Sequence, residues 1–205
     1  MAMTVEDVNE IKHAERVDGV LPIFHQRWSA RAFAHRDVAN EDLWRVFEAA
    51  RWAASSSNEQ PWRFVVGTRG TETHRHLVES LMPGNQVWAA KAPVLILGVA
   101  KARFSRDDRP NHYALYDLGA ASSHLTLQAA ALGLTTHQMA GYDREKARKL
   151  LAIPEGSDFG SVIALGYPAE PETLPSEELI KRETAPRERK ALNEIVFGEW
   201  GKGLF

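Results

Sequence analysis

The stretch Val94-Leu95-Ile96-Leu97-Gly98-Val99 holds only apolar side chains and one glycine, and it is rich in β-branched residues. A strand without polar alternation is typical of the middle of a sheet, where both faces are covered by other elements. The stretch therefore predicts a central strand that is buried on both of its faces.

The segment that follows this strand contains the longest helical pattern of the chain. Residues 103–110 are charged and loop-like, and residues 113–132 then repeat apolar or small side chains at helical spacing. We expect one side of this helix to carry Leu115, Leu118, Ser122, Leu125, Ala129 and Leu132. Gly133 is a suitable C-terminal stop, and residues 135–139 predict a further strand.

The segment before the central strand also alternates between helix and strand patterns. Residues 21–26 predict a short helix, and residues 41–53 predict an amphipathic helix with Asn40 as its N-cap. A strand is expected over residues 63–67, followed by a more polar helix over residues 70–80.

Beyond residue 168 the composition changes. Before that point, Asp143 predicts the cap of a short helix that Pro154 ends, and residues 161–167 predict a last apolar strand. Residues 170–186 are rich in Pro, Glu and Thr and have no clear core-facing period, so we expect an extended arm. Its end is apolar, with Ile195, Val196, Phe197, Trp200, Leu204 and Phe205. An extended tail with an apolar end is typical of strand addition to a partner subunit.

The composition bounds the kind of protein. A chain of 205 residues with 44% hydrophobic and 25% charged residues suits one domain with a sizeable core. The net charge of −2 predicts no nucleic-acid partner, and the apolar run at residues 92–100 is too short to span a membrane. The N-terminus lacks a secretory pattern and the chain has no cysteine, so a cytoplasmic location is expected.

The loop at residues 53–62 is the first candidate site. Small side chains, three serines, two carboxamides and a proline are packed into one short connection between a helix and a strand. Asn58 and Gln60 each offer donors and acceptors, which suits a flat polar heterocycle. The alternative interpretation is an ordinary turn, because Ser, Asn and Pro are common turn residues.

Three further segments are candidates. If Arg27-Trp28-Ser29-Ala30-Arg31 is extended, two guanidinium groups and one hydroxyl share a face that could bind a phosphate. Arg187 and Arg189 form a second basic cluster, and residues 138–142 place a glycine directly after a strand. A solvated basic turn, a surface charge run and a tight turn are the respective alternatives.

Other chemistries are disfavoured. The histidines lack partners at metal-ligand spacing, and no metal site is predicted. Ser55, Ser56 and Ser57 could suggest a serine nucleophile, but there is no Gly-x-Ser-x-Gly and no assignable His-Asp pair. The Gly-x-Gly-x-x-Gly and P-loop patterns are also absent, which argues against a Rossmann dinucleotide site or a nucleoside triphosphatase.

Taken in order, these motifs resemble the FMN-dependent nitroreductase family. The resemblance rests on Arg27-x-Ser29-x-Arg31 and, downstream, on Ala54-Ser55-Ser56-x-Asn58-x-Gln60-Pro61-Trp62. Weaker matches are residues 131–134, residues 164–168 and the tail Arg-x-Arg, and the whole resemblance spans roughly residues 20–198.

The resemblance implies an α+β fold with a mixed central sheet flanked by helices, assembled as an intertwined homodimer with an exchanged C-terminal arm. It divides the chain into an N-terminal segment at residues 1–19, an FMN-binding domain at residues 20–168 and an arm at residues 169–205 that docks on the partner subunit. Two FMN molecules would sit at the subunit interface, each contacted by both chains.

The resemblance also implies which residues bind the FMN. Arg27, Ser29 and Arg31, with the backbone of Trp28, would hold the phosphate and ribityl end. From the partner subunit, the cofactor would be reached by Ser55, Ser56, Asn58 and Gln60. The strand-end turn, comprising Met139, Ala140 and Gly141, would present backbone N–H groups to the flavin N5 region, and Arg187 and Arg189 would add cations.

The activity implied is an FMN-dependent oxidation of NADH or NADPH that reduces nitroaromatic, quinone or similar small aromatic acceptors by a ping-pong mechanism. No side chain is assigned a catalytic role, because the flavin carries the chemistry. Residues 81–88 and the loop at residues 103–112 are expected to shape the open face of the ring. Alternatives are a specialised flavin oxidase, dehydrogenase or dehalogenase on the same fold, a flavin-binding protein without turnover, or a structural dimer that has lost its cofactor.

Overall fold

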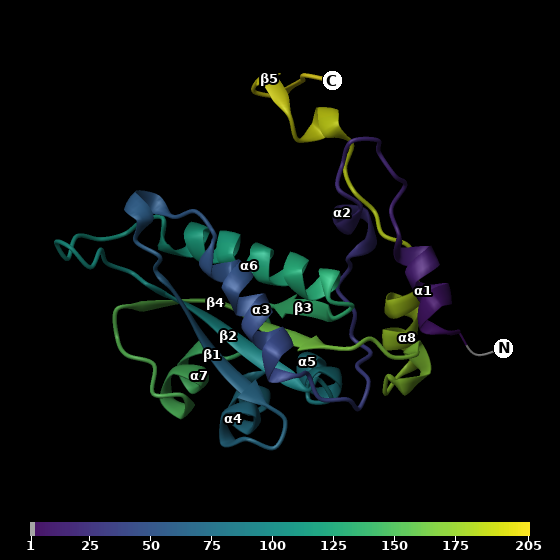
Figure 1. Cartoon of the computed structure of the whole chain (residues 1–205), viewed down its shortest axis with the longest axis horizontal. Helices are drawn as coiled ribbons and strands as arrows, with labels where there is room; N and C mark the ends of the chain where they lie inside the picture. Colours follow the sequence, from purple (N-terminus) through teal and green to yellow (C-terminus); the bar gives the residue numbers. More distant parts are fainter. Residues whose placement is uncertain (1–2) are drawn as a thin grey trace.

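An antiparallel sheet lies at the centre of the computed structural model, which describes residues 3–205 (Figure 1). Within these residues the sheet order is β1-β2-β4-β3, and each neighbouring pair runs antiparallel. The strands are β1 (Trp62–Thr68), β2 (Val94–Lys101), β3 (Thr135–Met139) and β4 (Ser157–Gly166). The expected α+β fold is confirmed, but the pairing differs from the mixed sheet that was expected, because no described strand pairs in parallel.

Strand β2 is the central strand that its sequence predicts. Every residue from Val94 to Ala100 is buried, since β1 and β4 flank the strand and helices cover both faces. Successive side chains enter opposite layers: Val94 and Ile96 belong to one apolar cluster, and Leu95 and Leu97 belong to the other.

Two helical layers enclose the sheet (Figure 1). The first contains α3 (Asn40–Arg51) and α6 (Ala114–Ala131), and the second contains α4 (Glu72–Ser80), α5 (Pro83–Ala89) and α7 (Arg144–Leu150). Helix α6 lies close to the sheet because Gly98 and Gly160 face it, and a Cβ on Gly160 would lie 2.7 Å from Leu118 Cδ2.

Most predicted elements occur where the pattern places them, with two corrections in α3 and α6. Helix α3 begins at Asn40, so the N-cap is Ala39, which offers no side-chain hydrogen bond. Leu115 was expected on the core side of α6, but it is 47% exposed, because the buried stripe begins one residue earlier, at Ala114. Helix α6 nevertheless stops as predicted, two residues before Gly133, which has a φ of +74°.

The termini contain helices that the sequence pattern did not predict. Helix α1 (Val5–Lys12) is one of these, and α8 (Glu177–Thr184), which interrupts the segment expected to be an extended arm, is the other. The short α2 (Pro22–Gln26) between α1 and the sheet was predicted over residues 21–26. Helix α8 forms because Ser176 caps it and acidic residues occupy its first turn, and it packs against α1. The remaining short elements are η1 (Ser56–Asn58), η2 (Pro171–Thr173), η3 (Leu192–Glu194), β5 (Phe197–Glu199) and β6 (Lys202–Gly203).

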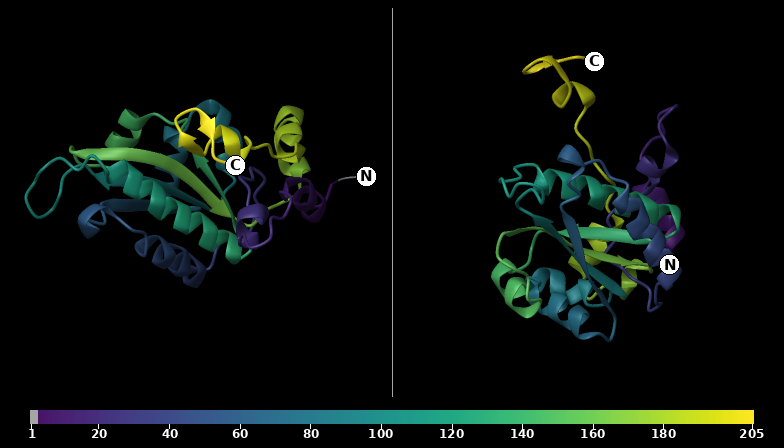
Figure 2. Two further views of the ribbon diagram at one scale, coloured as in Figure 1. Left: turned by 90° about the horizontal axis from the view of Figure 1, so that it is seen from above. Right: turned by 60° about the vertical axis from the view of Figure 1, so that its left-hand side comes forward.

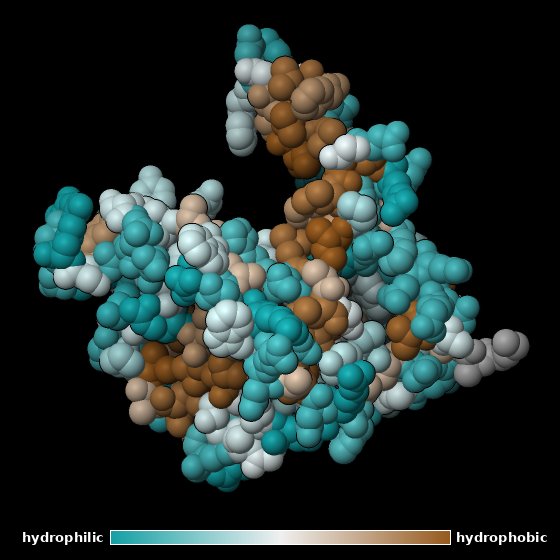
Figure 3. All heavy atoms as spheres, in the orientation of Figure 1, coloured by the Kyte–Doolittle hydropathy of each residue, from teal (hydrophilic) through white to brown (hydrophobic). Residues whose placement is uncertain are grey.

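The C-terminal segment projects from the body of the molecule. After α8 the chain runs beside α2, and η3 with the β5-β6 hairpin then lies clear of the sheet and its helices (Figures 1 and 2). Apolar side chains gather along this projection (Figure 3), and the exposed ones are Leu192, Ile195, Trp200, Leu204 and Phe205. Within the described residues, no helix combines the length and the apolar character needed to cross a membrane.

Candidate functional site

A cationic cavity lies where the segment after α2 meets the start of the tail. The cavity measures about 290 Å³, and of the described residues that line it none is acidic. It brings together predicted residues from two distant parts of the sequence, together with two that were not predicted, Lys12 and His137. The predicted ones are Arg27, Trp28, Ser29, Arg31, Arg187 and Arg189.

The Arg27–Arg31 segment has the extended form that its spacing predicts. Arg27 Nη2 donates to Ser29 Oγ at 3.3 Å, so these two side chains lie on the same face. The tail holds this segment in place, because Arg187 donates to the carbonyl oxygen of Arg27 at 2.6 Å and to that of His25. Arg187 therefore fixes the backbone from which Arg27 extends.

The cavity has more positive charge than its protein partners neutralise. Burial lowers the pKa of Arg27, and the neighbouring Arg189 lowers it further. The same two causes, burial first, act on the pKa of Arg187. The Nε atoms of Arg27 and Arg187 are buried and have no hydrogen-bond partner in the described chain. Buried donors are almost always satisfied, so an anion in this cavity is the expected partner.

Glu183 on α8 positions this segment from behind. Its Oε1 accepts the backbone N–H of Arg31 at 2.7 Å and that of Ala32 at 2.9 Å, and its Oε2 lies 3.7 Å from Arg31 Nη1. Burial raises the pKa of Glu183, against the hydrogen bonds and the Arg31 charge that favour its ionised form. The expectation of an irregular arm concealed this residue, because it lies in the segment without a clear apolar period.

His137 on β3 is a second contact that sequence reasoning missed. Its Nδ1 lies 3.1 Å from the carbonyl oxygen of Ser29 and 3.2 Å from that of Ala30, and its ring lies 4.7 Å from the ring of Trp88. Burial, with the Arg31 charge, lowers the pKa of His137 to about 4. A neutral imidazole with Nδ1–H donating to both carbonyls therefore ties β3 to the Arg27–Arg31 segment.

This histidine should make stability depend on pH. Its ordinary pKa is 6.5 and its folded pKa is about 4, so the unfolded chain takes up the proton first as the pH falls. The free energy of unfolding should therefore decrease between these two values by up to about 3 kcal/mol and level off below them. His137→Asn retains an N–H donor but does not titrate in this range. The difference in free energy of unfolding between wild type and variant, measured by urea unfolding, should therefore be smaller at low pH. Parallel pH profiles of the two proteins would contradict this account.

The serine-rich loop has an unusual backbone. Ser57, Asn58 and Gln60 have φ values of 53°, 54° and 51°, a left-handed region that non-glycine residues rarely adopt. Hydrogen bonds hold this shape: Ser55 Oγ accepts the Gln60 N–H at 3.0 Å, and Gln60 Nε2 donates to Asn58 Oδ1 at 3.2 Å. Backbone strain of this kind is concentrated at functional sites, so it favours a binding loop over an ordinary turn.

A buried carboxylate anchors the loop at the start of α6. Asp117 Oδ2 accepts the backbone N–H of Ser56 at 3.1 Å, and Asp117 is almost fully buried. Its negative charge also lies in the first turn of α6, where it interacts favourably with the helix dipole. Asp117 was not predicted, because it stands in a helical pattern that gives no indication of the loop it contacts.

The two main predicted parts of the site, the serine-rich loop and the Arg27–Arg31 segment, lie at opposite ends of α6 and are called its two halves below. The loop contacts Asp117 in the first turn, whereas Arg27 lies beside Thr126 and Ala130 near the other end. These positions are roughly 14 Å apart along a helix that rises 1.5 Å per residue. Figure 1 shows η1 and α2 at opposite ends of α6, and residues 55–60 are absent from the lining of the cationic cavity. One chain does not bring the two halves together.

The turn after β3 is the third predicted segment. Met139 is buried, whereas the Gly141 carbonyl accepts from Met82 N and Asn85 Nδ2, both at 3.0 Å. A Cβ on Gly141 would lie 2.7 Å from Asn85 Nδ2, so a larger residue there would displace the Asn85 side chain. Neither the Ala140 N–H nor the Gly141 N–H donates to another group of the described chain. Both amides are therefore free for a ligand.

Strand β3 connects this turn to the cationic cavity. His137 lines the cavity, and Gly141 follows four residues later, roughly 14 Å away if the chain is extended. The predicted flanking segments also lie near site residues: residues 81–88 contact Gly141, and Ser105 donates through N and Oγ to Glu59 Oε1 at 3.0 and 2.6 Å. This arrangement suits an elongated ligand with an anionic end and a heterocyclic end.

The described residues hold no group of three or more His, Cys, Asp or Glu side chains that could bind a metal ion. The fold and the cavity define an α+β protein with a cationic site at one edge of an antiparallel sheet. The model of the nitroreductase family matches residues 25–83 and 68–167, and the chain belongs to this family.

Known proteins resemble the chain over most of its length. A protein of Archaeoglobus fulgidus, provisionally named NADH dehydrogenase/NAD(P)H nitroreductase, is 32% identical over 154 residues, which are 73% of this chain and 86% of that protein. A crystal structure described as an oxidoreductase containing FMN is 35% identical with a TM-score of 0.84, over 91% of this chain and 94% of its own. The FMN complex of a provisionally named nitroreductase from Desulfovibrio desulfuricans is 26% identical with a TM-score of 0.70, over 90% of this chain and 98% of its own.

Proposed function

We propose that this protein is an FMN-dependent oxidoreductase that takes hydride from NADH or NADPH and reduces small aromatic acceptors such as nitroaromatics and quinones. The observation that carries the proposal is the cationic cavity with its two unpartnered guanidinium Nε atoms, connected by β3 to a turn with free backbone amides. The family and the FMN named in the description of one similar structure support it.

In this proposal different residues bind different parts of the cofactor. Arg27, Ser29, Arg31 and Arg189, with the backbone of Trp28, hold the phosphate through charge-assisted hydrogen bonds. Met139 is buried at the end of β3, and the amides of Ala140 and Gly141 in the following turn would donate to the ring near N5. The flavin, when bound, supplies the redox chemistry, and the protein supplies orientation and electrostatic tuning.

The site is completed by a second copy of the chain. Ser55, Ser56, Asn58 and Gln60 of the partner reach the FMN held by the Arg27–Arg31 segment of the first. The separation of the two halves along α6 supports this arrangement. The cationic cavity lacks residues 55–60 of its own chain, and the loop that carries them is held in a defined shape elsewhere. Exposed apolar residues on α6 and the tail support a dimer, among them Leu115, Tyr116, Leu192 and Trp200. Within the predicted arm at residues 169–205, α8 and Arg187 contact this chain's own α1, Arg31 and Arg27, so the part that docks on the partner is the projecting segment at residues 192–205. The cysteine-free chain suits the reducing cytoplasm.

Residues 81–88 and the loop at residues 103–112 would shape the open face of the ring, where reductant and acceptor would bind in turn. Residues 81–88 contact Gly141, and Ser105 contacts Glu59 within the serine-rich loop, which supports a role of both segments in substrate binding. Sharing one face predicts ping-pong kinetics, with parallel lines in double-reciprocal plots at several acceptor concentrations.

A visible spectrum followed by anaerobic titration tests the function. The purified protein should be yellow or take up one FMN per subunit. Anaerobic addition of NADH or NADPH should bleach the flavin absorbance at least as fast as the enzyme turns over. A colourless protein that takes up no FMN would contradict the proposal. A yellow protein that NAD(P)H reduces only slowly would instead indicate a specialised flavin oxidase, dehydrogenase or dehalogenase.

A further inference from the structure

Helix α1 lies outside the region that the nitroreductase family model matches, yet it contacts the cationic cavity. The N-terminus of the helix is capped: Thr4 and Asp7 form a capping box in which Thr4 Oγ1 accepts the Asp7 N–H at 3.2 Å. Val8 is 2% exposed, and the helix packs against α8. These contacts fix α1 to the body of the protein at the edge of the site.

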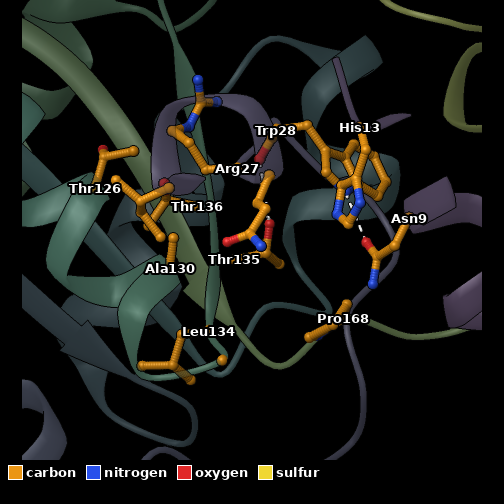
Figure 4. Close-up of a pocket in the computed structure, with 13 residues that line it drawn as sticks. Asn9, His13, Arg27, Trp28, Thr126, Ala130, Leu134, Thr135, Thr136 and Pro168 are labelled. Carbon is orange, nitrogen blue, oxygen red and sulfur yellow. Dashed lines mark hydrogen bonds between the residues drawn. The ribbon is translucent and has the colours of Figure 1, made fainter. Parts of the chain in front are cut away.

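Two side chains of α1 hold Trp28. The Trp28 indole N–H donates to Asn9 Oδ1 at 3.0 Å, a bond drawn in Figure 4, and Lys12 Nζ lies 5.1 Å from the centre of the indole ring. Trp28 stands between Arg27 and Ser29. Helix α1 therefore orients the segment that carries two of the cations.

Lys12 itself is placed among those cations. It is 7% exposed, and its ammonium donates to the carbonyl oxygens of Arg182, at 3.1 Å, and Ala185 at the end of α8. An ammonium has three N–H donors, so these two bonds leave one for a ligand. The cavity that Lys12 lines also contains Arg27, Arg31, Arg187 and Arg189.

We propose that Lys12 is a phosphate-binding residue, so that the N-terminal helix is a working part of the cofactor site. The assignment rests on the proposed FMN function and identifies a cation outside the two arginine motifs. Glu183 alone does not neutralise the group, because its single carboxylate charge stands against the five cations that line the cavity. A phosphate monoester dianion in the cavity would compensate the remaining charge.

The position of Lys12 is costly without such an anion. Burial lowers the pKa of Lys12, the charge of Glu183 opposes this, and the charges of Arg31 and Arg187 lower the pKa further. A lysine that only capped α8 could remain at the surface, where cations commonly interact with the last carbonyls of a helix. Lys12 is instead buried on the side of the cavity, where it faces other cations.

Comparing FMN with riboflavin, which lacks the phosphate, separates phosphate binding from a purely structural role. Lys12→Met keeps the apolar stem, and the full-length protein stripped of flavin is titrated with each ligand by fluorescence quenching. The variant should bind FMN at least about tenfold more weakly, with riboflavin affinity changed by less than about twofold. Lys12→Arg should restore most of the FMN affinity, and Lys181→Met, which removes an exposed cation of α8, should change neither.

Two results would overturn the assignment while the proposed function stands. These are unchanged FMN affinity in Lys12→Met, or equal loss of FMN and riboflavin affinity, which would indicate only a packing role. If wild-type protein binds neither flavin, the proposed function itself fails and the role of Lys12 fails with it.

Discussion

Replacing Arg27 with alanine is expected to weaken FMN binding by about 2–4 kcal/mol, or roughly 30- to 1,000-fold. The buried Arg27 Nε has no protein partner, and Nη2 is already oriented by Ser29 Oγ. Truncation removes both donors and one full charge from the place where the phosphate binds. The segment itself should stay docked, because Arg187 binds the Arg27 backbone carbonyl and not its side chain.

A matched variant separates this effect from a general loss of positive charge. Arg45→Ala removes an arginine on the outer face of α3 that pairs with Glu41 and Asp42, and such exposed pairs contribute little to stability. Its FMN affinity should equal that of the wild type. Riboflavin affinity should change little in either variant. If Arg27→Ala binds FMN as tightly as the wild type, the cationic cavity is not the phosphate site.

The sheet and the long helix could be predicted because their own residues determine them. Residues 94–99 are continuously apolar, and they form the buried centre of β2. Residues 135–139 coincide with β3, and Gly133 ends α6 in the left-handed conformation for which glycine is suited. In these places local pattern and tertiary context agree.

Helices α1 and α8 could not be predicted from local pattern, because their stability comes from tertiary contacts. Helix α8 is polar on most sides, and its main buried residue is a glutamate whose partners are backbone amides of residues 31 and 32. Its two apolar side chains, Leu179 and Ile180, are adjacent and only partly buried, so they form no repeat that the sequence alone would reveal. Helix α1 likewise contributes a buried lysine, an uncommon core residue.

The part of the candidate site that consists of short sequence motifs could be predicted. Arg27, Ser29 and Arg31 do share a cavity with the tail arginines, as their spacing and the family resemblance suggested. Asp117, His137 and Glu183 were missed because each acts on a backbone group far away in the sequence. Nothing in the residues next to them indicates those partners. The roles of all the site residues toward FMN stay predictions.

The central claim is that each FMN site is built from two chains, and mixed dimers test it most directly. One chain carries Arg27→Ala, and the other carries Ser56→Ala with Asn58→Gly. Glycine suits the φ of 54° at position 58, so the second chain loses its polar side chains without added backbone strain. The two chains are co-expressed with different affinity tags, and the mixed dimer is isolated by successive purification on both tags.

In a mixed dimer with composite sites, one site receives both defects and the other receives neither. Tight FMN binding should therefore return at one site per mixed dimer, although both parental homodimers bind FMN weakly. A doubly tagged wild-type dimer, purified in the same way, should bind two FMN and provides the reference. If the mixed dimer shows no tight FMN site, each site lies within a single chain and the composite arrangement is wrong.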